Sequence, residues 1–157
     1  MNRLVKVFTA GMFLAASFGA LGQTVEKKVL SLEGARKAAA AAEVEARKNN
    51  WNVVIAVVDD GGHLLYLQRM DGTQTGSVQV AIDKARTAQS FKRPTKVFED
   101  AIAGGRNALL GLHGALPLEG GLPILVGGQL VGAIGVSGVK STEDGQIAKA
   151  GVDALGM

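Results

Sequence analysis

Two histidines are the side chains of this sequence best suited to bind a metal ion. His63 directly follows the segment Asp59–Gly62, which reads Asp-Asp-Gly-Gly. A neutral imidazole at such a turn can bind haem iron or a divalent metal. Asp59 and Asp60 are close enough in sequence to orient that imidazole or to add oxygen ligands. His113, beside Gly114, is the second candidate, and a surface histidine with no ligand is the alternative reading of both.

Four charged residues form a second candidate site. Arg69, Asp71, Lys84 and Arg86 could line a polar pocket in which arginine binds a carboxylate through two hydrogen bonds and lysine adds a point charge. The alternative is an Arg69–Asp71 bridge beside a solvated helix edge. Arg69 shares a strand face with His63 but lies about 20 Å further along it. It should therefore not reach the propionates of a haem held by His63, unless the site lies between two subunits.

Apolar periodicity predicts the elements that must position these residues. Helical spacing begins after Ser31, a plausible N-cap, and continues to Asn49. Runs typical of strands and helices then follow in the order Val53–Val58 (strand), His63–Met70 (strand), Ser77–Lys92 (helix), Thr95–Ala103 (helix), Leu122–Val126 (strand), Leu130–Val136 (strand) and a last helix from Ser141. The hairpins indicate an antiparallel sheet with helices packed on it, which is an α+β domain.

Two smaller patterns each allow two interpretations. The helix Ser77–Lys92 carries a second line of side chains, namely Val80, Lys84, Thr87 and Phe91. This line is covered either by a partner, meaning a ligand or another subunit, or by the rest of the monomer itself. The glycines at 132, 135 and 138 resemble a nucleotide-binding loop. They fall within and just beyond a strand, so close packing is the favoured interpretation.

The N-terminal stretch Met1–Gly22 is typical of a signal peptide. Arg3 and Lys6 precede the apolar run Val7–Ala20, and a small-x-small cleavage site lies before Gln23. We therefore expect a mature domain, residues 23–157, that is periplasmic or secreted. The apolar run is shorter than the ~20 residues of a membrane span, so no span is expected after processing.

Composition excludes several classes of function. The chain has no cysteine, which rules out disulfides, covalent c-type haem and iron–sulfur clusters. Its 17 Lys+Arg include Arg3 and Lys6, so the mature domain keeps 15 basic against 14 acidic residues, a net charge of +1. That balance gives no electrostatic basis for nucleic-acid binding. No nucleophile elbow or Walker loop is present, so catalysis is not the favoured expectation.

Several segments together resemble the GlcG/HbpS-like family, which includes the C-terminal domain of PduO proteins. They are Val57–Leu65, Arg69–Gly72, Lys84–Ala88, Gly120–Ile124 and Val131–Gly138. The resemblance implies profilin-like αβα layers around a five-stranded antiparallel sheet. It also implies a homo-oligomer, from dimer to octamer, and binding of haem or another tetrapyrrole in some members.

The resemblance and the residues leave three functions open. The first is an exported haem-binding protein in haem handling or redox sensing, with His63 the preferred iron ligand and His113 the second. The next is an enzyme or binding protein for a small organic acid such as glycolate, using Arg69, Asp71 and Lys84. The last is an oligomeric assembly module in which the line from Val80 to Phe91 is an interface.

Overall fold

The computed structural model describes residue 22 and residues 24–156. The signal peptide expected at Met1–Gly22 lies, but for Gly22, outside the described residues. The helices are α1 (Leu32–Lys48), α2 (Ser77–Phe91), α3 (Lys96–Ala103) and α4 (Ser141–Asp153), with a 3₁₀ turn η1 (Asn107–Gly111). The strands are β1 (Val54–Asp59), β2 (Leu64–Arg69), β3 (Gly121–Val126) and β4 (Gln129–Ser137).

The four strands form one antiparallel sheet in the order β2-β1-β4-β3. The expected α+β class is confirmed. Within the described residues the sheet has four strands, where the resemblance implied five. β1 lies between β2 and β4 and is almost wholly buried, as its apolar run predicts, because a central strand is covered on both faces.

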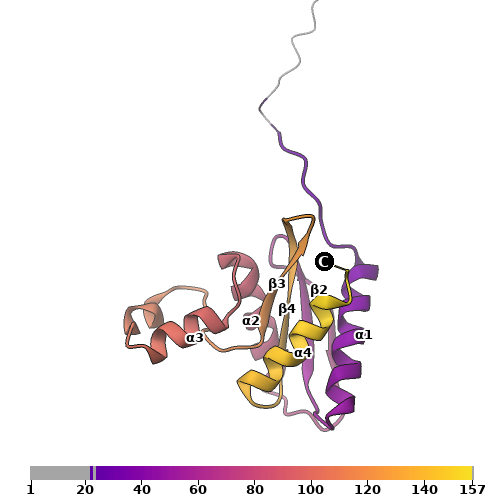
Figure 1. Ribbon diagram of the computed structural model, residues 1–157, viewed down its shortest axis with the longest axis vertical. Coiled ribbons are helices and arrows are strands. Elements are labelled where there is room, and N and C mark those ends of the chain that lie inside the picture. The colour runs from indigo at the N-terminus through magenta and orange to yellow at the C-terminus, as the bar shows by residue number, and fades with distance from the viewer. Residues whose placement is uncertain (1–21, 23, 157) are drawn as a thin grey trace, which may run out of the picture.

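Helices cover both faces of the sheet (Figure 1). α1 and α4 pack side by side on one face, where Ile55 and Val57 of β1 contact the alanine stripe of α1. α2 packs on the other face against Val54 and Val58. Successive strand residues point to opposite faces, so β1 supplies both halves of the core. Ser31 caps α1 as predicted, its hydroxyl accepting from Gly34 N at 3.1 Å.

Two glycines of β4 lie so close to neighbouring backbone that a side chain would not fit, and at Gly135 that backbone is α2. A Cβ on Gly135 would lie 2.1 Å from the Ala81 carbonyl oxygen and 2.5 Å from the Ala85 nitrogen. On Gly132 it would meet the Val58 oxygen at 2.4 Å. The close-packing interpretation is therefore confirmed for both glycines, because a Cβ on Gly135 would collide with the backbone of α2 and a Cβ on Gly132 with the backbone of β1.

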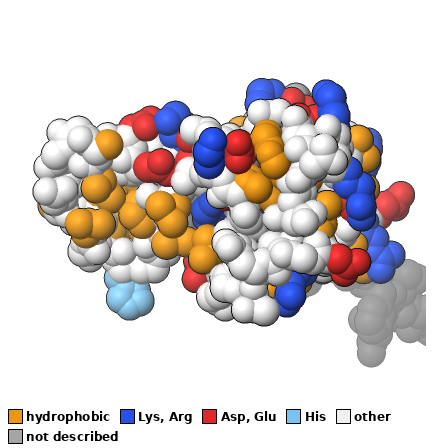
Figure 2. All heavy atoms as spheres, turned by 90° about the horizontal axis from the view of Figure 1, so that it is seen from below, with side chains coloured by type: hydrophobic (Ala, Val, Ile, Leu, Met, Phe, Trp, Pro, Cys, Tyr) orange, Lys and Arg blue, Asp and Glu red, His pale blue; other side chains and the backbone are white. Residues whose placement is uncertain are grey.

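α3 and η1 form a lobe that projects from the side of the domain (Figure 1). Phe98 anchors it by packing edge-on against Phe91, with ring centroids 5.4 Å apart. Thr95 precedes α3 but makes no capping hydrogen bond with its side chain; its hydroxyl instead accepts from Gly121 N at 2.9 Å and ties the lobe to β3. Figure 2 shows hydrophobic side chains gathered along this lobe. In the described part of the chain, no helix combines the length and apolarity needed to cross a membrane.

Most of the second line on α2 is covered within the chain itself. Lys84 and Thr87 are buried, and Phe91 is half-buried under Phe98. The Thr87 hydroxyl accepts from Leu116 N at 2.8 Å, so the segment after η1 lies over this face. Burial within the monomer is thus the interpretation that fits this line, which leaves little of it free for an interface.

Candidate functional site

The turn between β1 and β2 exposes the His63 side chain to solvent, and hydrogen bonds to Asp59 fix the backbone of the turn. One carboxylate oxygen of Asp59, Oδ1, accepts hydrogen bonds from the backbone nitrogens of Gly61 and His63, both at 2.8 Å. The same oxygen lies 3.5 Å from Nδ1 of His63, whose side chain is 83 % exposed. A carboxylate beside Nδ1 is common in metal-binding histidines, because it orients the ring and leaves Nε2 available to the metal.

The Asp59 carboxyl keeps its charge in this turn. Burial alone would raise its pKa, but the backbone hydrogen bonds from His63 and Gly61, together with the nearby imidazole, lower the pKa below its ordinary value. Gly61 makes the contact possible, because a Cβ there would lie 2.9 Å from Nδ1 of His63 and 3.3 Å from Oδ1 of Asp59. The sequence expectation that Asp59 could orient the imidazole agrees with this geometry.

Two side chains from the C-terminal half of α2 donate hydrogen bonds to this turn. Nε of Arg86 donates to the Gly62 carbonyl at 3.3 Å, and the Gln89 amide donates to the Asp60 carbonyl. Beside Asp60 and Gln89 lies a hollow of about 330 Å³. Three lysines line it, namely Lys27, Lys28 and Lys92. Glu26 and Asp60 line it as well, and Lys27 forms an ion pair with Asp60. The turn that carries His63 therefore borders a hollow, here called the basic hollow, whose lysines outnumber its carboxylates by three to two.

Arg86 also connects this turn with the segment that carries His113. His113 is exposed, and the residues directly after it, Gly114–Leu116, line a hollow of about 360 Å³ with Asp83 and Arg86. Arg86 therefore contacts the His63 turn on one side and faces the segment after His113 on the other. Sequence analysis placed Arg86 with Arg69 instead, since it could not show that residues 114–116 fold back over α2.

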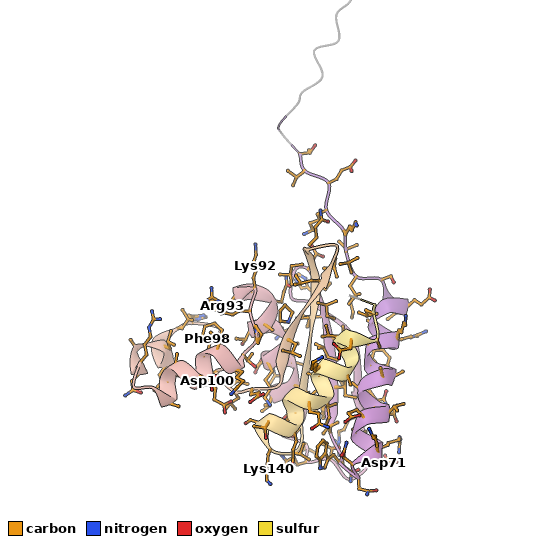
Figure 3. All side chains as sticks on the ribbon, viewed as in Figure 1. Asp71, Lys92, Arg93, Phe98, Asp100 and Lys140 are labelled. Atoms are coloured by element: carbon orange, nitrogen blue, oxygen red, sulfur yellow. The ribbon has the colours of Figure 1, made fainter. Side chains whose placement is uncertain are left out.

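Arg69 and Asp71 lie far from the His63 turn. Arg69 ends β2 opposite Val54, whereas His63 precedes the other end of the strand. Figure 3 shows Asp71 at the opposite end of the domain from Lys92, which lines the basic hollow. Arg69 is exposed and, within the described residues, makes no ion pair with Asp71. The strand-length argument that separated Arg69 from His63 agrees with this arrangement.

Lys84 does not join Arg69 in a polar pocket. Its side chain is only 2 % exposed, and Nζ donates to Oδ2 of Asp144 at 2.7 Å and to the Val136 carbonyl at 3.0 Å. Burial raises the pKa of the Asp144 carboxyl, and the Lys84 charge opposes that rise. Asp144 also lies in the first turn of α4, where the helix dipole favours a negative charge. The pair is missed because its members lie 60 residues apart.

The described residues hold no cluster of three or more histidine, aspartate or glutamate side chains arranged around a common metal position. What they offer near the His63 turn is one oriented imidazole and several cations. This arrangement suits a ligand that already contains a metal ion and carries anionic groups.

The domain is of the α+β class. It has helices on both faces of an antiparallel sheet and carries an exposed histidine on a hairpin turn. The family described as "Haem degrading protein HbpS-like" matches residues 30–153. The chain belongs to this HbpS-like family, as its motif series predicted.

Named relatives agree with this assignment. Protein GlcG of Escherichia coli strain K12 is 47 % identical over 111 residues, which are 71 % of this chain and 83 % of GlcG. A double mutant of HbpS from Streptomyces reticuli superposes with a TM-score of 0.78 at 34 % identity, covering 99 % of this chain and all of that one. PduOC in its complex with haem has a TM-score of 0.74 at 28 % identity, covering 80 % of this chain and 94 % of that one.

Proposed function

We propose that this chain is an exported haem-binding protein in which His63 is the iron ligand. The observation that carries the proposal is the exposed imidazole held by Asp59 in a chain related to PduOC, which has been solved with haem. The His63 imidazole would hold the haem iron, and the haem would supply the redox chemistry when bound. The protein's part is to present Nε2 outward and to keep Nδ1 against a carboxylate.

The surroundings of the His63 turn offer cations that would hold the propionates of a haem. A haem carries two propionates, and the hollow beside Asp60 offers Lys27, Lys28 and Lys92. Ammonium groups attract carboxylates as point charges, so these lysines are better placed than Arg69 for a haem on the same subunit. Arg69 remains a proposed contact only for a haem shared between subunits. Lys84 is enclosed with Asp144 and reaches no ligand in this arrangement.

Titration with hemin tests the iron ligand. The wild-type protein should give a shifted Soret band, and His63→Ala should weaken hemin binding by about tenfold or more, because the axial bond is lost. Gly61→Ala should also weaken binding, since its Cβ would push the imidazole off Asp59 without disturbing the core. The affinity of each variant is read from the absorbance change against hemin concentration.

His113→Ala is the matched control for this titration, because His113 is the other histidine of the chain and is also exposed. It should leave the Soret band unchanged. A band that survives in His63→Ala but is lost in His113→Ala would transfer the ligand role to His113. A band that neither substitution alters would contradict histidine ligation altogether.

Export and assembly belong to the same proposal. The residues of Met1–Gly22 support export, and the mass of the protein recovered from its native compartment measures whether they are removed.

Exposed apolar side chains support a homo-oligomer. They lie on or beside the projecting lobe and are Val97, Leu110 and Leu118. Light scattering of the mature protein gives the number of subunits.

A further inference from the structure

A third hollow lies between the start of β3, the start of α3 and the exposed side of α4. Its volume is about 370 Å³, within the range of small-molecule sites. Pro94, Leu122 and the backbone of Gly120 and Gly121 make most of its wall apolar. No residue that lines it also lines the basic hollow beside Asp60.

Glu119 places a carboxylate in this hollow with hydrogen-bonding capacity to spare. Its side chain is only 16 % exposed, and Oε2 is buried without a hydrogen-bond partner among the described residues. The nearest cation, Nζ of Lys96, is 3.6 Å from Oε2 and already donates to Asp100 at 2.8 Å. Enclosed carboxylates with unmet acceptors favour an added donor, above all a charged one.

Gly145 makes room for that carboxylate. It lies inside α4, where glycine is disfavoured relative to alanine because it has more conformational freedom to lose. A Cβ at this position would lie 2.6 Å from Oε1 of Glu119. Alanine at position 145 would favour the helix more than glycine does, but it would collide with the Glu119 carboxylate, which rests against the backbone of α4.

Lys149 supplies the opposite charge one helical turn further along α4. Residues four apart on a helix share a face, so Lys149 follows Gly145 along the edge of the hollow. Its ammonium is 2.5 Å from Oδ2 of Asp153, but both side chains are more than half exposed. Such an exposed pair is weak and exchanges its partner at little cost.

The hollow thus combines a carboxylate whose ion-pair partner Lys96 is 3.6 Å away and shared with Asp100, an ammonium with an exchangeable partner, and apolar walls. We propose that it binds a zwitterionic α-amino acid with an apolar side chain. The amino group donates to Glu119, the carboxylate faces Lys149, and the side chain packs against Pro94 and Leu122. This assignment is independent of haem binding, since the two sites share no residue.

Thermal denaturation with leucine and two analogues tests the proposal. Leucine that binds only the native state should raise the melting temperature, because the stabilisation grows with the logarithm of one plus the ratio of its concentration to its Kd. The same concentration of 4-methylpentanoate, which lacks the amino group, or of 3-methylbutylamine, which lacks the carboxylate, should give no comparable shift. An unchanged melting temperature with leucine, or an equal shift with either analogue, overturns the assignment.

Two substitutions and a control locate the site by calorimetric titration with leucine. Glu119→Gln should weaken binding about tenfold or more, because a charge-assisted hydrogen bond is lost. Gly145→Ala should weaken it as well while favouring the helix, so lost binding there is not a consequence of unfolding. Glu33→Gln, an exposed control on α1, should bind like the wild type. Unchanged leucine affinity in both Glu119→Gln and Gly145→Ala overturns the proposal.

Discussion

Replacing Lys84 with methionine should lower the free energy of unfolding by about 3–5 kcal/mol. The substitution roughly keeps the side-chain volume but leaves the Asp144 carboxylate buried with no cation, since Nζ of Lys84 is its ion-pair partner at 2.7 Å. It also removes the donor to the Val136 carbonyl. Urea denaturation followed by circular dichroism measures the loss as a shift of the midpoint at unchanged slope.

The double variant Lys84→Met with Asp144→Leu separates charge from packing. Removing both charges abolishes the uncompensated carboxylate, so the double variant should recover most of the stability lost in Lys84→Met. A double variant as unstable as the single one would mean that the cost lies in packing or in the lost Val136 contact, contrary to this account.

The pH dependence of the Lys84→Met variant follows from the same burial. Burial raises the pKa of Asp144 in the folded chain above its value of about 3.9 in the unfolded chain. Below the unfolded pKa the carboxyl is neutral in both states, so it adds no penalty there. As the pH rises through the folded pKa the penalty of a buried charge grows, and it is complete above that pKa. The deficit relative to wild type should therefore be larger at pH 7 than at pH 3.

Gly135→Ala is expected to have the second large effect, a loss of about 1–3 kcal/mol or more. The new Cβ would lie 2.1 Å from the Ala81 oxygen and 2.5 Å from the Ala85 nitrogen, which are backbone atoms and cannot rotate away. α2 would have to move off the sheet, which loosens its contacts with Val54 and Val58. Urea denaturation again measures the change.

Gly76→Ala is the matched control, because a Cβ there meets nothing within 4 Å and its φ is −59°. It should be neutral or slightly stabilising, since alanine restricts the unfolded chain. Equal stability of the Gly135→Ala and Gly76→Ala proteins would show that α2 can retreat from β4 without cost, against the close packing described above.

Local patterns in the sequence were enough to determine the secondary structure and its order. Alternating and helical spacing placed every helix and strand to within one or two residues at most ends. The Asp-Asp-Gly-Gly turn placed His63 at the end of a hairpin, because turn residues act over a few positions. The rise per residue along a strand also separated His63 from Arg69, which share a strand face but lie at opposite ends of the strand.

The partners of the charged residues were decided only by the tertiary structure. Lys84 faces Asp144 across 60 residues, and Glu119 rests on Gly145 because β3 begins beside α4. Neither contact has a local signature: helical spacing says which side of α2 Lys84 occupies, but not which strand or helix end will cover it. A buried charge needs a partner within the same dehydrated region of the core. Which residues lie in that region depends on how the helices pack against the sheet, whose strand order is β2-β1-β4-β3.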